Sequence, residues 1–183
     1  MRSLGRWHFY RHEYTESVQC FTKSFEINRN KADDWFTCGC AYMRLEELDK
    51  AIFAFGNVVA IDEQQVEAWG NIANCYAVQD RYKEALACTE QALKINRRHW
   101  KIWQNCIRFS LSTNNFYKAV NCIRELLNKD QFEGLNGALC LKLTEIFLSK
   151  YTVEAGISRT EADRHKGFLY EFFREWCDKI NDY

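Results

Sequence analysis

Nine cysteines and four histidines are the residues in this 183-residue chain that could support nucleophilic or metal chemistry. An odd number of cysteines at irregular spacing, with no C-x-x-C pair, does not form a disulfide framework. Since a helix turns about 100° per residue, Cys38 and Cys40 would point about 200° apart. We therefore interpret the cysteines as small buried side chains in a reducing compartment. They are Cys20, Cys38, Cys40, Cys75, Cys88, Cys106, Cys122, Cys140 and Cys177.

Other catalytic patterns are weak or missing. His8 and His12 are four residues apart, as two zinc ligands on one helical face could be, but the sequence around them is not H-E-x-x-H. No G-x-x-x-x-G-K-[ST] or G-x-G-x-x-G motif is present. Paired carboxylates such as Asp33-Asp34 stand at an expected helix start, where the helix dipole stabilises negative charge. The sequence predicts no enzyme, no cofactor and no metal, and a metal or thiol enzyme is the least favoured alternative.

The amino-acid composition further narrows the possible classes of fold and function. The chain is 47% hydrophobic and 27% charged, has no formal net charge, and contains no proline and only eight glycines. These values favour a globular protein of long helices with short connections. No apolar run reaches the roughly 18 residues of a membrane span, and no secretory leader is visible. We expect an intracellular protein, in the cytoplasm and also in the nucleus, that binds neither nucleic acid nor membrane.

A period of 34 residues organises most of the chain. Trp35, Trp69 and Trp103 are 34 residues apart, and small residues keep the same interval at Gly39 and Ala73. Internal periods of this length are typical of stacked helix pairs. The small residues at these positions would let the first helix of each pair approach the second closely. The further columns are Ala51, Ala85 and Ala119; Tyr14, Leu48, Tyr82 and Phe116; and Ile27, Ile61 and Ile95.

Within one period, Trp35-x-x-Cys38-Gly39-x-x-Tyr42 followed by Ala51-x-x-x-Phe55 resembles the tetratricopeptide repeat signature. The resemblance implies an all-α fold, a right-handed solenoid of antiparallel helix pairs. Arg29, Glu63, Arg97 and Gln131 replace the proline that usually ends a repeat. We expect helix pairs at 32–45 with 48–61, 66–79 with 82–95, and 100–113 with 116–128.

These pairs predict four repeats in residues 1–132, at about 1–31, 32–65, 66–99 and 100–132. The first repeat is shortened at its start, so we expect the chain to be a piece of a longer protein. After residue 132 the period fades, and 133–183 is interpreted as a degenerate capping helix pair that covers the last repeat. Its final helix has a wide apolar stripe, so self-association or partner binding there stays an alternative. The stripe consists of Phe168, Leu169, Phe172, Phe173, Trp176 and Ile180.

Stacked helix pairs usually bind ligands on the concave side, which the first helix of each repeat lines. The period places polar and aromatic residues at outward positions of those helices. Asparagine amides can both donate and accept hydrogen bonds, as the backbone of an extended peptide requires, and arginines would attract an acidic ligand. The candidate groove residues are Arg6, Phe36, Asn71, Asn74, Lys101, Gln104, Asn105 and Arg108, and Arg2, Glu67 and Gly70 lie on the same face.

Relatives that bind chaperone C-termini resemble one another in a carboxylate clamp of Lys, Asn, Asn, Lys and Arg. Asn71 and Lys101 match two of these places, whereas Phe36, Cys40 and Asn105 occupy the other three. A chaperone-tail receptor is therefore a weakened alternative. Residues 32–65 carry a net charge of −5 between basic repeats, and such banding suits protein partners better than a phosphate backbone.

The segments His99-Trp100-Lys101-Ile102-Trp103-Gln104-Asn105 and Trp35-Phe36-x-Cys38-Gly39-Cys40-Ala41-Tyr42 resemble the C-terminal repeat region of the tetratricopeptide repeat protein 27 family. That resemblance implies a non-enzymatic, chaperone-associated assembly role. We expect a scaffold that binds a protein or extended peptide segment in its groove. A structural spacer without a groove ligand stays an alternative.

Overall fold

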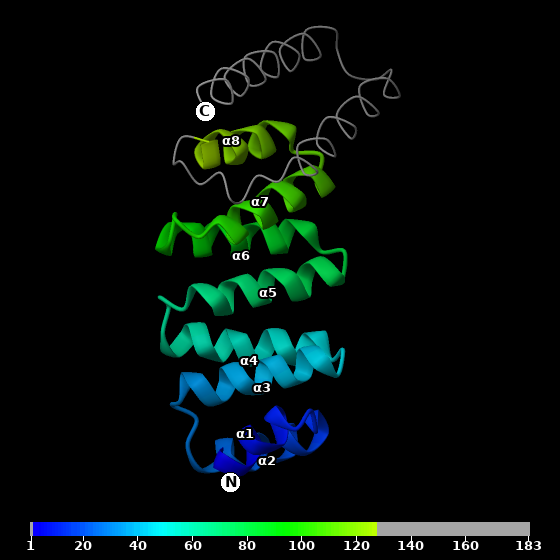
Figure 1. Ribbon diagram of the computed structural model, residues 1–183, viewed down its shortest axis with the longest axis vertical. Coiled ribbons are helices and arrows are strands. Elements are labelled where there is room, and N and C mark those ends of the chain that lie inside the picture. The colour runs from blue at the N-terminus through cyan, green and yellow to red at the C-terminus, as the bar shows by residue number, and fades with distance from the viewer. Residues whose placement is uncertain (1, 128–183) are drawn as a thin grey trace, which may run out of the picture. The chain divides into compact units, whose positions relative to one another are not determined.

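The computed structural model describes residues 2–127, and these residues form eight helices and no strand (Figure 1). The predicted all-α solenoid is confirmed. The five helices predicted between residues 32 and 113 begin at the predicted residue and end within one residue of the predicted end, and the helix predicted from residue 116 begins there. The capping pair expected at 133–183, its apolar stripe, Cys140, Cys177 and His165 lie outside the described residues. The helices are α1 (Arg2–Tyr10), α2 (Tyr14–Ile27), α3 (Ala32–Arg44), α4 (Leu48–Ile61), α5 (Val66–Val78), α6 (Tyr82–Ile95), α7 (Trp100–Ser112) and α8 (Phe116–Leu127).

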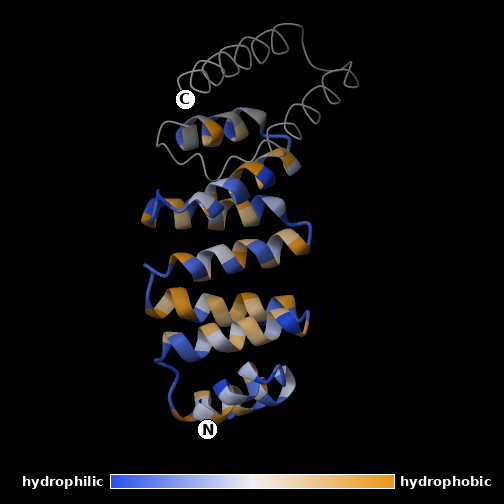
Figure 2. Ribbon diagram, viewed as in Figure 1, coloured by the Kyte–Doolittle hydropathy of each residue, from blue (hydrophilic) through white to orange (hydrophobic). Residues whose placement is uncertain are grey.

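The chain divides into two compact units, Met1–Thr113 and Asn114–Tyr183, so α8 belongs to the second unit. In the first unit α1 packs on α2, α3 on α4 and α5 on α6, and successive pairs meet through α2 with α3, α4 with α5 and α6 with α7. Figure 1 shows this stack in chain order. Figure 2 shows α4 mostly in the colours of hydrophobic residues and the connecting turns in hydrophilic colours. Helix α4 packs on both α3 and α5, so its apolar residues are covered on two sides.

A matched pair of residues sets the close approach within a repeat. A Cβ atom added to Gly39 would lie 2.8 Å from Cε1 of Phe55, a fully buried ring in the core. One period earlier, a Cβ atom on Gly5 would lie 3.2 Å from the ring of Phe21. The interpretation that small residues let the two helices approach is confirmed in these two repeats.

Each turn between the two helices of a repeat contains one residue with a left-handed backbone. These residues are His12, Glu46, Asp80 and Asn114, with φ between 57° and 62°, and they are one period apart. After α3, the amide of Glu46 donates to Met43 O at 3.2 Å and that of Glu47 to Tyr42 O at 3.0 Å. This is the Schellman hydrogen-bond pattern, which satisfies the last carbonyls of a helix. The prediction that His12 lies at a turn is confirmed.

The turns between repeats use side chains where the family usually has proline. Asp62 Oδ1 accepts the amide of Gln64 at 3.0 Å, and the indole Nε1 of Trp69 donates to Glu63 O at 3.2 Å. The same two bonds recur one period away on either side, from Asn28 with Trp35 and from Asn96 with Trp103. The tryptophan column therefore has a polar role, because each indole binds the carbonyl six residues earlier.

No helix among the described residues is long and apolar enough to cross a membrane.

Candidate partner-binding groove

The first helices of successive repeats present their outward residues to a row of two shallow hollows in the first unit. We call them the α1–α3–α5 hollow and the α3–α5–α7 hollow after the helices that contribute residues. The α3–α5–α7 hollow has a volume of about 400 Å³. It is lined by Phe36, Val66, Glu67, Gly70, Asn71, Asn74, His99, Lys101, Ile102 and Asn105.

Five predicted groove residues, Phe36, Asn71, Asn74, Lys101 and Asn105, line this hollow together. Asn105 Nδ2 donates to Asn74 Oδ1 at 3.3 Å, which orients both amides. Asn71 forms no hydrogen bond to another side chain in the part of the chain that the structure describes, so its donor and acceptor are free for a ligand. The period brought these side chains to one face, and the stacking of α5 against its neighbours brought them into one hollow.

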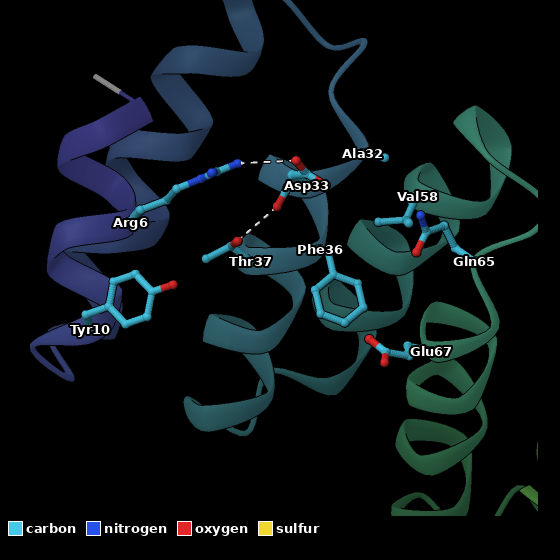
Figure 3. Close-up of a pocket in the computed structure, with 9 residues that line it drawn as sticks. All are labelled: Arg6, Tyr10, Ala32, Asp33, Phe36, Thr37, Val58, Gln65 and Glu67. Atoms are coloured by element: carbon cyan, nitrogen blue, oxygen red, sulfur yellow. Dashed lines mark hydrogen bonds and ion pairs between the residues drawn. The ribbon is translucent and has the colours of Figure 1, made fainter. Parts of the chain in front are cut away.

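The α1–α3–α5 hollow has a volume of about 290 Å³ and extends the row toward the N-terminus (Figure 3). Charged side chains from three helices reach it, since Arg6 of α1, Asp33 near the start of α3 and Glu67 near the start of α5 all line it. Its lining residues are Arg6, Tyr10, Ala32, Asp33, Phe36, Thr37, Val58, Gln65 and Glu67.

Arg6 lines this hollow, but its charge has a partner in the protein. Its Nη2 atom lies 2.9 Å from Asp34 Oδ1 and 3.8 Å from Asp33 Oδ2. Arg2 Nε lies 3.2 Å from the other oxygen of Asp34 and 3.2 Å from Ser24 Oγ. Asp34 is only 2% exposed, so both guanidinium groups compensate a buried carboxylate. The expectation that Arg2 and Arg6 attract an acidic ligand needs correction, because their charges tie α1 to α3.

Gln104 and Arg108 line neither hollow. Arg108 is exposed, and its Cζ atom lies 4.9 Å from the centre of the Phe109 ring. The structure adds residues that the candidate set lacked, among them Gln65 and His99, which directly precede α5 and α7. Their spacing of 34 residues was the available signal, since a residue just before a helix reaches the same face as its first turn. Glu67, which the period already placed on this face, lines both hollows.

The thiols nearest this face are poor nucleophiles. Burial raises the pKa of Cys38 to about 12 and that of Cys75 to about 11. Burial also raises the pKa of Cys40, with a smaller contribution from Glu67. Since the thiolate is the reactive form, these cysteines stay protonated at neutral pH. The two histidines of the zinc hypothesis have separate partners, with His8 Nδ1 2.7 Å from Glu13 Oε2 and His12 Nδ1 2.8 Å from Tyr14 Oη.

Comparison with known proteins identifies the repeats. The sequence model described as tetratricopeptide repeat matches residues 35–65 and 66–99. A TPR repeat-containing protein of Schizosaccharomyces pombe is 31% identical over 147 residues, which are 78% of this chain and 18% of that protein. The tetratricopeptide repeat protein 27 homolog of Dictyostelium discoideum is 31% identical over 170 residues, which are 92% of this chain and 20% of that protein. The chain thus spans about a fifth of the length of these curated relatives.

Solved structures support the fold. The crystal structure of MamA superimposes with a TM-score of 0.70 at 14% identity and covers 96% of this chain and 97% of that one. The first TPR of Spaghetti (RPAP3), bound to the HSP90 peptide SRMEEVD, superimposes with a TM-score of 0.58 at 18% identity and covers 62% of this chain and 90% of that one. The predicted resemblance is confirmed by the sequence matches, which identify tetratricopeptide repeats at residues 35–65 and 66–99 of this chain.

Proposed function

We propose that this protein is a non-enzymatic scaffold that binds an extended segment of a protein partner along the two hollows. The observation that carries the proposal is the joining of Asn71, Asn74 and Asn105 with Lys101 in one hollow of about 400 Å³. Amide side chains can pair with the N–H and C=O groups of an extended backbone, which every peptide offers. A lysine at the edge of this amide row adds attraction for a carboxylate without demanding a fixed geometry.

The relatives support a finer proposal about the partner. One relative is named a tetratricopeptide repeat protein 27 homolog, and one structural neighbour holds an HSP90 peptide. We therefore propose a role in a chaperone-linked assembly, in the cytoplasm and nucleus. Direct capture of a chaperone tail is disfavoured, because Phe36, Cys40 and Asn105 replace the Lys, Asn and Arg of the carboxylate clamp.

The test is a pull-down from cell lysate, quantified by mass spectrometry, with the wild type and the double variant Asn71→Ala/Asn105→Ala. The matched control is Asn30→Ala/Asn57→Ala, because these asparagines line neither hollow. We expect the groove variant to lose specific partners at least tenfold, since two hydrogen bonds at about 1 kcal/mol each are lost, and the control to keep them. Circular dichroism checks that each variant keeps the helical content of the wild type. Equal partner lists for groove variant and wild type would contradict the proposal.

A labelled peptide SRMEEVD, the sequence bound in the structural neighbour, tests the clamp alternative. We expect it neither to bind the wild type tightly nor to displace the captured partners. Displacement that the substitution Lys101→Ala abolishes would revive the chaperone-tail receptor.

A further inference from the structure

One aromatic ring and one carboxylate form the wall between the two hollows. Phe36 from α3 and Glu67 from α5 line both hollows, so a chain that runs through the groove must pass them. Figure 3 shows the Glu67 carboxylate extending from α5 toward the ring of Phe36. The two side chains belong to successive repeats, and only the packing of α4 and α5 brings them together.

The carboxylate of Glu67 has no compensating cation. It is exposed and forms no ion pair with any residue that the structure describes. Arg6, the cation of the α1–α3–α5 hollow, lies 2.9 Å from Asp34 and is therefore compensated already. Lys101 lines the α3–α5–α7 hollow with Glu67, yet no ion pair within 4.0 Å joins them among the described side chains. Negative charge therefore remains at the wall.

The ring of Phe36 is fixed in position and partly accessible. It packs edge-to-face on Phe55, with ring centres 5.5 Å apart and an interplanar angle of 69°. Phe55 is fully buried, whereas Phe36 is half-buried, so part of the Phe36 ring remains open to the groove. A fixed aromatic surface attracts cations through its negative face.

A ring beside a carboxylate matches one side chain best. A guanidinium is planar, stacks on aromatic rings, and donates two parallel hydrogen bonds to a carboxylate. An ammonium is a compact and strongly hydrated charge that gains less from stacking. We propose that the partner segment carries an arginine that inserts between Phe36 and Glu67. This inference rests on the proposed function, since it names the side chain that the groove selects.

The test selects 12-residue peptides from a random phage-displayed library on the immobilised full chain, for the wild type and for Glu67→Gln. Enriched peptides are sequenced, and those that Asn71→Ala/Asn105→Ala fails to bind are counted as groove ligands. We expect arginine to be enriched several-fold at one position of the groove ligands for the wild type and to fall to the library frequency for Glu67→Gln. The matched control Glu26→Gln alters an exposed glutamate of α2 that lines neither hollow, and it should keep the enrichment.

A selected peptide then gives the strength of the contact. Replacing its arginine by glutamine should weaken binding to the wild type about tenfold, as expected for a charged hydrogen bond, and should change binding to Glu67→Gln little. Phe36→Leu should weaken the arginine peptide more than the glutamine peptide, which identifies the stacking contribution. Both substitutions lie on the groove surface, and circular dichroism verifies the fold.

The outcomes separate this inference from the proposed function. Groove ligands without arginine enrichment, or with an enrichment that Glu67→Gln leaves unchanged, would overturn the arginine inference and leave the groove function standing. A library that yields no groove ligand from the wild type would overturn both.

Discussion

At the scale of single residues, the repeat depends on which side chains are absent as much as on which are present. Position 39 needs glycine, because a methyl group there would stand 2.8 Å from the ring of Phe55. One repeat later Ala73 holds the glycine place, and Thr89 holds the place of the phenylalanine. Thr89 is buried and donates its hydroxyl to Ala85 O at 2.8 Å. The repeat that has the larger alanine in place of glycine therefore has the smaller threonine in place of phenylalanine.

Gly39→Ala should destabilise the protein by about 1–3 kcal/mol, the usual cost of overpacking a core. The matched control is Gly56→Ala on α4, where an added Cβ meets nothing within 4 Å. That control should gain about 0.5–1 kcal/mol, since alanine loses less backbone entropy in a helix. Urea unfolding followed by circular dichroism measures both. Equal stabilisation of the two variants would mean that the Phe55 ring moves aside freely.

At the scale of elements, the connections between repeats replace proline with two hydrogen bonds each. Asp62 is extended, with φ −142° and ψ 98°, and residue 63 holds the usual proline position. An extended backbone is what the residue before a proline requires. The amide of Glu63 donates no hydrogen bond within the described part of the chain, so a proline there would break none.

Glu63→Pro should therefore stabilise the protein by about 0.4–1 kcal/mol, because the ring restricts the unfolded chain. The corresponding rise in melting temperature is roughly 1–4 °C for a protein of this size. Glu63→Ala is the control for loss of the charge and should change the melting temperature less. A lower melting temperature for Glu63→Pro would show that residue 63 does not adopt the backbone that proline requires.

At the scale of the whole molecule, stacked repeats contact mainly their neighbours, so each end of a stack depends on few interfaces. In the Met1–Thr113 unit, α1 packs on α2 and reaches α3 through the buried carboxylate of Asp34. Phe25 of α2 stacks on Trp35 of α3 with ring centres 3.6 Å apart. These contacts hold the first helix pair to the rest of the unit.

Asp34→Asn should speed hydrogen exchange of the α1 amides about tenfold or more and leave α5 and α6 protected. The physical reason is that Arg2 and Arg6 lose a buried counter-charge, at a cost of about 1–3 kcal/mol given their partial exposure. Asp33→Asn is the matched control, since the Asp33 side chain is 85% exposed, and surface changes stay within about 0.5 kcal/mol. Exchange in α1 that is equally fast in both variants would exclude a special role for Asp34.

Much of the fold could be predicted from the period alone. The helix ranges were predicted from tryptophan, small and aromatic residues that recur every 34 residues. Such recurrence predicts structure because one short unit must bury the same face each time it recurs. The turn residues Glu46 and Asp80 occupy equivalent places and have the same left-handed backbone for the same reason. Five of the eight candidate groove residues line one hollow, since equal positions on stacked first helices lie side by side.

The tertiary structure decided which charges are free. Asp33 and Asp34 are adjacent carboxylates in sequence, but one is exposed and the other is buried against Arg2 and Arg6. A period assigns each residue an angle around its helix, and it does not state how far neighbouring helices are displaced or where long side chains end. For that reason the sequence by itself determined a stack of tetratricopeptide-like helix pairs with a polar groove face. Only the packing of α1 on α3 removed Arg6 as a free cation, and only the packing of α4 on α5 placed Glu67 beside Phe36.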